Sequence, residues 1–176
     1  MDGTTNFVHR YPCFAVSIGL LYKNRPLIAA VLEMPNIKLY SAIDSEGAYC
    51  EGSRIFCSTT SELIHSLLTT GFGYEHGELW NKNMKLFKHL TGLTQGVRRL
   101  GAAAIDICHV AEGKIDGFWE YDLYPWDTAA GILIAQESGC IVSKINGEKY
   151  NLNTDKNIVV ANPNIYHQLL KELNSI

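Results

Sequence analysis

The sequence lacks the features that mark membrane, nucleic-acid-binding or disulfide-bonded proteins. No apolar run in its 176 residues is long enough to span a bilayer, and no basic leader precedes a hydrophobic stretch at the N-terminus. The formal net charge of -3 does not indicate the basic surface that a nucleic-acid partner requires. Because 47% of the residues are apolar and no low-complexity run is present, we expect one globular domain with neither a membrane nor a nucleic acid as partner.

The cysteines show no metal-binding or disulfide pattern. There are five, an odd number, and no two of them form a Cys-x-x-Cys pair. Reduced, buried thiols in a cytoplasmic or organelle-stromal protein are therefore expected. Cys13 and Cys108 are interpreted as packing residues.

The secondary-structure pattern changes near residue 60. Strand-like segments dominate before it, and strands alternate with helices after it, which predicts a layered α/β architecture. We interpret 1–60 as an antiparallel-sheet part and 61–176 as an α/β part of a single domain. The first part is predicted to hold strands at 15–22, 27–34, 38–43 and 47–51, with a turn at 44–46.

Four helices are predicted in the second part. The helix over 80–90 would bury Trp80, Met84, Leu86, Phe87 and Leu90 on one face, and Asn146-Gly147 is typical of a hairpin turn. The other predicted helices span 101–111, with Ile105, Cys108 and Val110 inward, and 127–138, and a last one begins at the cap Asn162-Pro163 and runs to about Leu173. The predicted strands of this part are 66–71, 96–100, 115–121, 141–144 and 158–161.

Two acidic motifs have the residue types that a phosphate site needs. In Asp2-Gly3-Thr4-Thr5, glycine lets the backbone approach an anion and free N–H groups can hold it. In Trp126-Asp127-Thr128-Ala129-Ala130-Gly131, a carboxylate begins a helix whose small residues allow close packing by another element. Each motif taken alone is better explained as a capped turn or helix start.

Two further features lie near the second motif. Glu120 comes at the end of a predicted strand, and strand ends that face helix starts are where α/β proteins bind ligands. Gly101 and the alanines after it begin another helix, which could offer N–H groups to the same anion or simply pack closely in the core.

These motifs resemble those of a known family. Residues 2–7 resemble the end of the Asp-Pro-Ile/Leu-Asp-Gly-Thr-Thr-Asn-Phe signature of magnesium-dependent inositol monophosphatases, and residues 126–131 resemble the second signature of that family. The segments 12–19, 101–108 and 117–127 are also similar in order and spacing, so the resemblance covers essentially the whole chain. It implies the αβαβα sugar-phosphatase fold, here lacking the N-terminal helices and first strands.

The resemblance implies a metal-dependent catalytic site. Asp2 and Asp127 match carboxylate ligands of a magnesium cluster, and Met1 matches a residue that offers its backbone carbonyl to a metal. Gly3 and Thr4 match groups that hold the phosphate and orient the attacking water. Asp2, Thr4 and Asp127 are thus the implied catalytic residues, and two or more Mg²⁺ ions the implied cofactor.

The implied substrate site adds residues from two further segments. Glu120 matches an acid that hydrogen-bonds ring hydroxyls, and Gly101, Ala102 and Ala103 match a loop near the inositol, with Gly3, Thr4 and Asp127 also touching substrate. Ala102 stands where some members have threonine, and Tyr124 where some have histidine. The reaction implied is hydrolysis of inositol monophosphate or a similar small polyol or sugar phosphate. Lithium sensitivity and a homodimer are implied as well.

Part of the family pattern is missing. An upstream Asp and an upstream Glu, which activates water in the family, have no counterpart, so the chain resembles an N-terminally truncated or naturally short member. We expect weak or no activity, because Mg²⁺ needs more anchored oxygens than Asp2 and Asp127 supply, and an exposed apolar surface where the absent helices pack. The alternatives are a non-catalytic fragment that acts through protein contacts, and a histidinol-phosphate or other sugar phosphatase.

Overall fold

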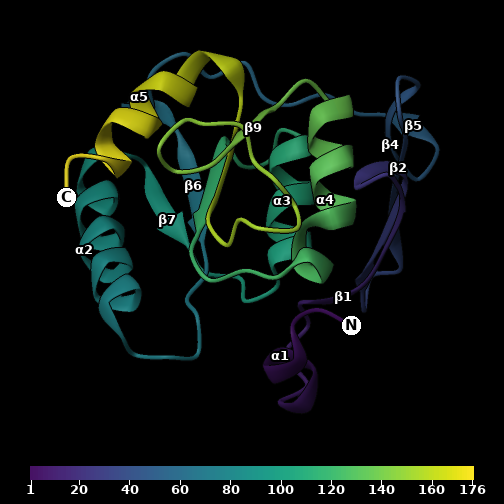
Figure 1. The fold of residues 1–176 in the computed structure, drawn as a ribbon, viewed down its shortest axis with the longest axis horizontal. Coiled ribbons are helices and arrows are strands. Elements are labelled where there is room, and N and C mark those ends of the chain that lie inside the picture. The colour runs from purple at the N-terminus through teal and green to yellow at the C-terminus, as the bar shows by residue number, and fades with distance from the viewer.

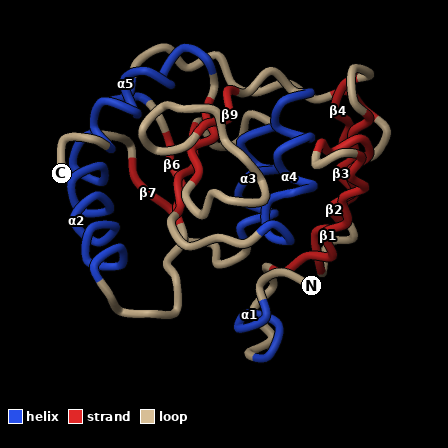
Figure 2. Tube along the Cα trace, viewed as in Figure 1, coloured by secondary structure: helices blue, strands red, loops and turns tan.

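The computed structural model describes residues 1–176 and arranges them in four layers. Figure 1 shows a sheet of β1 to β5 on one side, then helices α3 and α4, then a second sheet, with α2 and α5 on the other side. Figure 2 shows helices between and outside the two groups of strands. The predicted layered α/β class is confirmed. No helix combines the length and the hydrophobicity that crossing a membrane requires.

The first sheet is the predicted antiparallel meander. Its strands follow chain order, and each pairs with the next in antiparallel register. The four predicted strands are present within two residues of their expected bounds, and a fifth, very short strand was not predicted. The strands are β1 (Phe14–Tyr22), β2 (Arg25–Met34), β3 (Lys38–Ile43), β4 (Gly47–Cys50) and β5 (Ser53–Arg54).

The inner face of this sheet is built from small residues, which lets helix α4 (Pro125–Glu137) lie against it. A Cβ added at Gly19 in β1 would be 3.2 Å from the Cβ of Ala129, and one added at Gly131 would be 3.0 Å from Ile107 in α3 (Ala103–Ala111). The close packing expected from the small residues after Asp127 is therefore present. It holds the N-terminal end of α4 against β1, which follows the first acidic motif.

The outer face of the first sheet is apolar and exposed. Val16, Ile18 and Leu20 of β1 are 44%, 62% and 55% exposed, and Ile28 and Ile43 continue the patch on β2 and β3. These side chains alternate along β1 with inward-facing ones, as pleating requires. This sheet face is thus an exposed apolar surface, and its cover by helices of the family pattern stays a prediction.

The second sheet mixes parallel and antiparallel pairs in the order β7-β6-β8-β10-β9. Strand β6 runs parallel to both β7 and β8, so all three end at the same edge. Strand β10 is antiparallel to β8 and β9. The strands are β6 (Leu67–Thr70), β7 (Gly96–Arg98), β8 (Gly117–Glu120), β9 (Ile141–Ser143) and β10 (Ile158–Ala161).

The predicted helices form, with shifted ends. Helix α3 begins two residues later than expected, because Gly101 has a φ of +84° and Ala102 is extended. Helix α4 begins two residues earlier, with Pro125 at its first position. The other helices are α2 (Glu78–Leu93), α5 (Pro163–Leu173, capped by Asn162 as predicted), and the unpredicted α1 (Thr4–Val8) and 3₁₀ helix η1 (Leu63–His65).

Two local predictions were wrong. Met84 of α2 is 41% exposed, and Asn83 is buried in its place because its side chain donates to Gly71 O (2.6 Å) and accepts from Trp119 Nε1 (2.6 Å). Asn146-Gly147 forms the predicted turn, with Gly147 N–H bonding Lys144 O at 2.9 Å and Lys144 N–H bonding Glu148 O at 2.8 Å, but no strand directly follows the turn to make a hairpin. Strand β9 pairs instead with the distant β10, because that pairing extends the central sheet.

Candidate active site

Every residue of the predicted site lines one cavity of about 400 Å³. It lies where β6 and β8 end and where three helices, α1, α3 and α4, begin. Helix N-termini carry a partial positive charge and unpaired N–H groups, so their convergence favours an anion. The predicted residues that line the cavity are Met1, Asp2, Gly3, Thr4, Gly101, Ala102, Ala103, Glu120 and Asp127.

Hydrogen bonds with main-chain groups hold both the backbone and the side chain of Asp2. Its main chain pairs with Ala15 at the start of β1 (2.8 and 3.0 Å). Its carboxylate accepts from Gly3 N–H (2.8 Å) and from Ala104 N–H in the first turn of α3 (2.7 Å). The Asp2 side chain therefore joins the first motif to a helix that begins about a hundred residues later.

Gly3 is required by the shape of the first motif. Its φ of +77° is left-handed, and an added Cβ would be 2.9 Å from Cys13 O and 3.2 Å from Ala102 Cβ. Any other residue would be strained and would push away the start of α3. Gly3 thus lets Thr4 begin α1 at the cavity wall.

Asn6 connects the same motif to the loop before α3. Its amide donates to Cys13 O (2.7 Å) and to Leu100 O (2.8 Å), next to Gly101. Sequence reasoning quoted Asn6 within the signature but gave it no role. The contacts make it a positioning residue for the cavity wall.

Asp127 lies in the first turn of α4. Its carboxylate accepts from Tyr124 N–H at 2.9 Å, so Asp127 caps the helix from the third helical position, and Tyr124 rather than Asp127 is the N-cap residue. Asp127 also lines the cavity, so it caps the helix and faces the site at once. Beside it, Trp126 is 69% exposed and stacks on Tyr124 with centroids 4.7 Å apart.

Glu120 ends β8 at the back of the cavity. Its carboxylate lies directly against Gly71, where an added Cβ would be 2.2 Å from the carboxylate oxygens. No cation or N–H group pairs with it. The carboxylate is therefore available to accept hydrogen bonds from a ligand.

Asp106 is a cavity residue that sequence reasoning missed. It is 1% exposed in α3, and its Oδ1 accepts from Thr69 Oγ1 at 2.5 Å. Its Oδ2 is buried without any partner. An acid between Ile105 and Ile107 in an otherwise apolar helix was the signal that could have found it.

The cavity concentrates negative charge. Burial raises the pKa of Asp2 and Asp127, and the charge of Asp127 adds to the rise at Asp2. Burial and then the neighbouring acids raise the pKa of Glu120 well above its ordinary value. Burial and the charge of Asp2 also raise the pKa of Asp106, although the hydrogen bond from Thr69 and the charge of Arg99 partly oppose them. Carboxylates that repel one another in this way favour a bound cation.

The donor set fits a hard cation only in part. Asp2, Asp127 and the Met1 carbonyl are oxygen ligands of the kind Mg²⁺ prefers, and the unpaired Asp106 oxygen adds negative charge nearby. However, no three acidic, histidine or cysteine side chains are grouped closely enough to hold an ion. That Asp2, Asp127 and Met1 bind a metal therefore stays a prediction.

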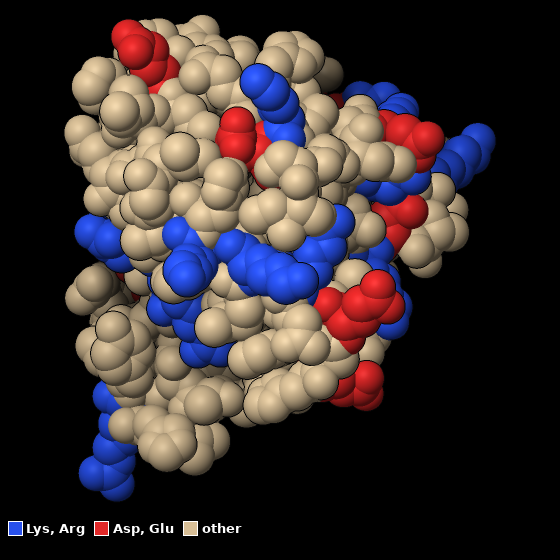
Figure 3. All heavy atoms as spheres, turned by 90° about the vertical axis from the view of Figure 1, so that its left-hand side faces the viewer, with Lys and Arg blue, Asp and Glu red and all other residues tan.

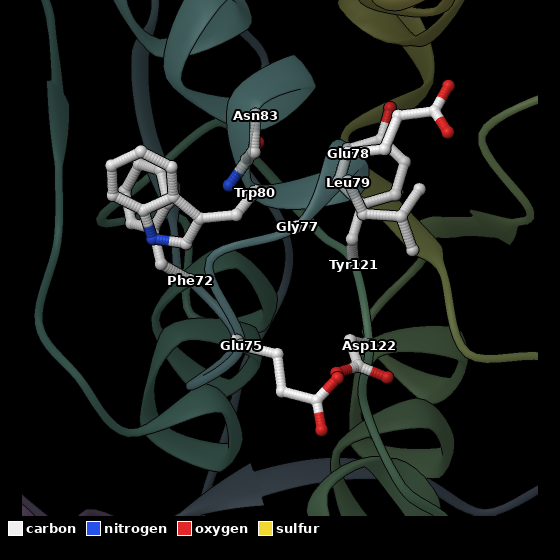
Figure 4. A pocket seen from close by; sticks show the side chains of 10 residues that line it. Phe72, Glu75, Gly77, Glu78, Leu79, Trp80, Asn83, Tyr121 and Asp122 are labelled. Atoms are coloured by element: carbon white, nitrogen blue, oxygen red, sulfur yellow. The ribbon is translucent and has the colours of Figure 1, made fainter.

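A smaller cavity of about 220 Å³ adjoins the first. The two share Phe72, Gly73, Glu75 and Asp122. Figure 4 shows acids and aromatic rings around it, among them Trp80 and Tyr121. The Tyr121 hydroxyl is buried with no hydrogen-bond partner.

The two sheets, the helix layer between them and the acid-lined cavity at the helix N-termini define a protein of the layered sugar-phosphatase fold. The sequence profile described as "Inositol monophosphatase family" matches residues 1–176. The chain therefore belongs to the inositol monophosphatase family.

Similar proteins come from plants and bacteria. The chain is 46% identical over 179 residues to "Phosphatase IMPL1, chloroplastic" of Arabidopsis thaliana, covering 98% of this chain and 48% of the relative. It is 44% identical to "Inositol-1-monophosphatase" of Synechocystis (98% and 60% covered) and 38% identical to "Nus factor SuhB" of Escherichia coli (98% and 64% covered). It thus spans about half to two thirds of the length of these relatives.

Solved structures share the fold closely. The inositol monophosphatase of Anabaena superposes with a TM-score of 0.95 at 40% identity, covering 99% of this chain and 71% of that one. The suhB protein of Bartonella henselae gives a TM-score of 0.93 at 34% identity, covering 99% and 66%. The sugar-phosphatase architecture expected from the motifs is therefore confirmed.

Proposed function

We propose that this chain forms the phosphate-binding part of an Mg²⁺-dependent phosphatase for inositol monophosphate or a similar polyol phosphate. The observation that carries the proposal is that Asp2 and Asp127 meet in one cavity with the N-termini of three helices. Carboxylates favour a cation and helix N-termini favour an anion, so a metal phosphate satisfies both.

The residues that line the cavity would have two roles, metal binding and phosphate binding. Asp2, Asp127 and the Met1 carbonyl would hold the metal. Gly3 and Thr4, at the start of α1, would orient the phosphate and the attacking water. A bound Mg²⁺ supplies a more acidic water and charge stabilisation of the leaving oxygen.

The first turn of α3 completes the phosphate side of the cavity. Ala104 N–H is taken by Asp2, whereas Ala103 N–H has no partner in the chain. That free N–H is available to a phosphate oxygen. Gly101 and Ala102 hold the loop that aims it.

Glu120 favours a polyol as leaving group. Its unpaired carboxylate can accept hydrogen bonds from ring hydroxyls, and its raised pKa also lets it donate when protonated. Ala102 and Tyr124, where some family members have threonine and histidine, would change which polyol fits best.

The neighbouring cavity supports a second substrate class, a phosphate ester that carries a cationic or aromatic amine, such as histidinol phosphate. Glu75, Glu78 and Asp122 would attract the cation, and Phe72 and Trp80 would pack against a ring. Glu78→Gln, which alters only the neighbouring cavity, would weaken the binding of such a substrate and leave the binding of a polyol phosphate unchanged.

Two carboxylate ligands predict weak or no turnover by this chain alone. The test is phosphate release from inositol 1-phosphate with Mg²⁺, at high protein concentration, for the unmodified chain and for Asp127→Asn. Release that is reduced at least a hundredfold in Asp127→Asn would support the assigned site. Equal and measurable release from both would contradict the assigned site, whereas no release from either is the result expected if two carboxylates cannot hold the metal.

A role through protein contacts is the second candidate function. Relatives named Nus factor SuhB share 38–42% identity with the chain. The chain also offers the exposed apolar face of β1 to β3 and a band of Lys and Arg side chains on the side where α2 and α5 lie (Figure 3).

A homodimer, lithium sensitivity and a cytoplasmic or stromal location remain predictions, and the chloroplastic Arabidopsis relative is consistent with a stroma. If Asp127→Asn keeps its fold and still binds a protein partner, the role through protein contacts does not depend on catalysis.

A further inference from the structure

Cys57 and Cys140 lie side by side at the end of α4, far along that helix from Asp127. Cys57 N–H bonds Ser138 O at 3.0 Å, and Cys57 Sγ lies 3.7 Å from where a Cβ on Gly139 would be. The Cys57 side chain thus packs against the segment Ser138–Cys140. Both side chains belong to the same packed cluster.

The two thiols differ in access and in acidity. Cys57 is half-buried, whereas Cys140 is only 7% exposed. The neighbouring Cys140 thiol, opposed by partial burial, lowers the pKa of Cys57 to about 7. The same contact, together with burial, raises the pKa of Cys140. An accessible thiolate beside a buried thiol is the arrangement of an attacking and a resolving cysteine.

The other cysteines lack this arrangement. Burial and nearby acids raise the pKa of Cys13 to about 12, although Cys13 is also half-buried. Cys108 is fully buried, and burial raises its pKa well above the ordinary value. Burial also raises the pKa of Cys50. Reactivity toward an oxidant should therefore be confined to one pair.

We propose that Cys57 and Cys140 form a site of reversible oxidation, at which a small-molecule or protein disulfide converts the two thiols into an intramolecular disulfide. The proposal rests on the packing of Cys57 against Ser138 and Gly139, which places it beside Cys140, and on the unequal access to the two thiols. It is independent of the phosphatase site.

The chemistry balances as two exchange steps. The Cys57 thiolate attacks one sulfur of the oxidant, forming a mixed disulfide and releasing one thiolate. Cys140 then gives its proton to solvent and attacks the Cys57 sulfur, releasing the second thiolate. The two protein thiols lose two electrons, and the oxidant disulfide is reduced to two thiols.

The new bond would join the segment after β5 to the junction between α4 and β9. It would close a loop of roughly 80 residues, which restricts the unfolded chain strongly. Because α4 carries Asp127 at its other end, the bond would stabilise the helix that positions the site. A rise of about 5 °C or more in the unfolding midpoint is expected.

The experiment treats the folded chain with oxidised glutathione and maps tryptic peptides without reduction. Residues 55–82 and 115–144 form two peptides that each contain one cysteine, so the bond gives a single cross-linked product. We expect this product, the loss of two of the five free thiols, and full reversal by dithiothreitol. Cys57→Ser and Cys140→Ser should each abolish it, whereas Cys13→Ser should leave it unchanged.

Several results would overturn the proposal. A glutathione adduct that persists on Cys57 while Cys140 stays free would show that the second step fails. Cross-linking seen only after denaturation would show that the folded chain does not bring the sulfurs together. If either serine variant fails to fold, alkylation of the unmodified chain provides the second measurement: iodoacetamide should label Cys57 before Cys13, and equal labelling would contradict the assignment.

Discussion

The two ends of helix α3 hold acidic side chains in opposite environments. At its N-terminal end, Asp2 and Asp106 face the cavity and form no salt bridge, and burial raises the pKa of both. At its C-terminal end, Glu112 accepts from Lys38 Nζ (2.6 Å) and Tyr40 Oη (2.7 Å). Burial would raise the pKa of Glu112, but the hydrogen bonds from its partners outweigh burial and lower it to about 2.

This comparison separates structure from function along one helix. Paired acids stabilise the fold, and His109, which bonds Glu33 at 3.3 Å, extends the paired end. Unpaired acids cost stability and are retained where a ligand supplies the missing charge. The same residue type thus serves two purposes, and the partner decides which.

The largest effect should come from breaking the paired end. Glu112→Gln removes a charge that Lys38 and Tyr40 hold, so the free energy of unfolding at pH 7 should fall by about 3 kcal/mol. Because the folded pKa lies below the ordinary 4.5, this stabilisation is present above pH 4.5 and is lost as pH falls toward 2. Urea unfolding of both proteins across that interval measures it. Parallel pH curves would contradict the pairing.

Supplying the missing charge should stabilise the unpaired end. Mg²⁺ at ten times its dissociation constant should add about 1.4 kcal/mol and raise the unfolding midpoint by a few degrees. Asp127→Asn should lose this response, and Glu148→Gln, which alters a surface pair with Lys144, should retain it. Differential scanning calorimetry provides the measurement. The same rise in Asp127→Asn would mean that the ion binds elsewhere.

Removing a charge at the unpaired end should also stabilise the fold, opposite in sign to Glu112→Gln. Glu120→Gln should raise the free energy of unfolding by about 1 kcal/mol at pH 7 and reduce polyol binding. Because burial raises the folded pKa of Glu120, its unfavourable contribution grows as pH rises from 4.5 through that pKa. Chemical unfolding at pH 4 and pH 8 should show the gain only at the higher pH. A loss at both would place Glu120 among the paired acids.

The smallest effect on the free energy of unfolding is expected for an ion pair at the surface. Arg25 and Asp44 are 2.6 Å apart, but the Arg25 side chain is 66% exposed. Water screens this pair, so Asp44→Asn should cost about 0.5 kcal/mol or less. Unfolding at low and high salt measures it. A cost near that of Glu112→Gln would show that exposure does not explain the difference.

Much of the fold could be predicted from local pattern. The strands of the first sheet alternate inward and outward residues with a period that only a strand satisfies, and Asn162-Pro163 fixes the start of α5. The two acidic motifs identified the family and the cavity residues. Met84 and Asn83 were assigned wrongly because helical spacing alone does not show that Trp119 and Gly71 would bond an amide.

The sequence by itself determined the elements, the motifs and the family, because these depend on neighbours within a few positions along the chain. Only the tertiary structure decided which acids lack partners. Asp2 accepts a hydrogen bond from Ala104, and Cys57 lies near Cys140, although each pair is far apart in the sequence. Asp106 becomes a candidate site residue only because the fold buries its Oδ2 without a hydrogen-bond partner. Burial and through-space charge set a pKa, and neither is a property of sequence spacing.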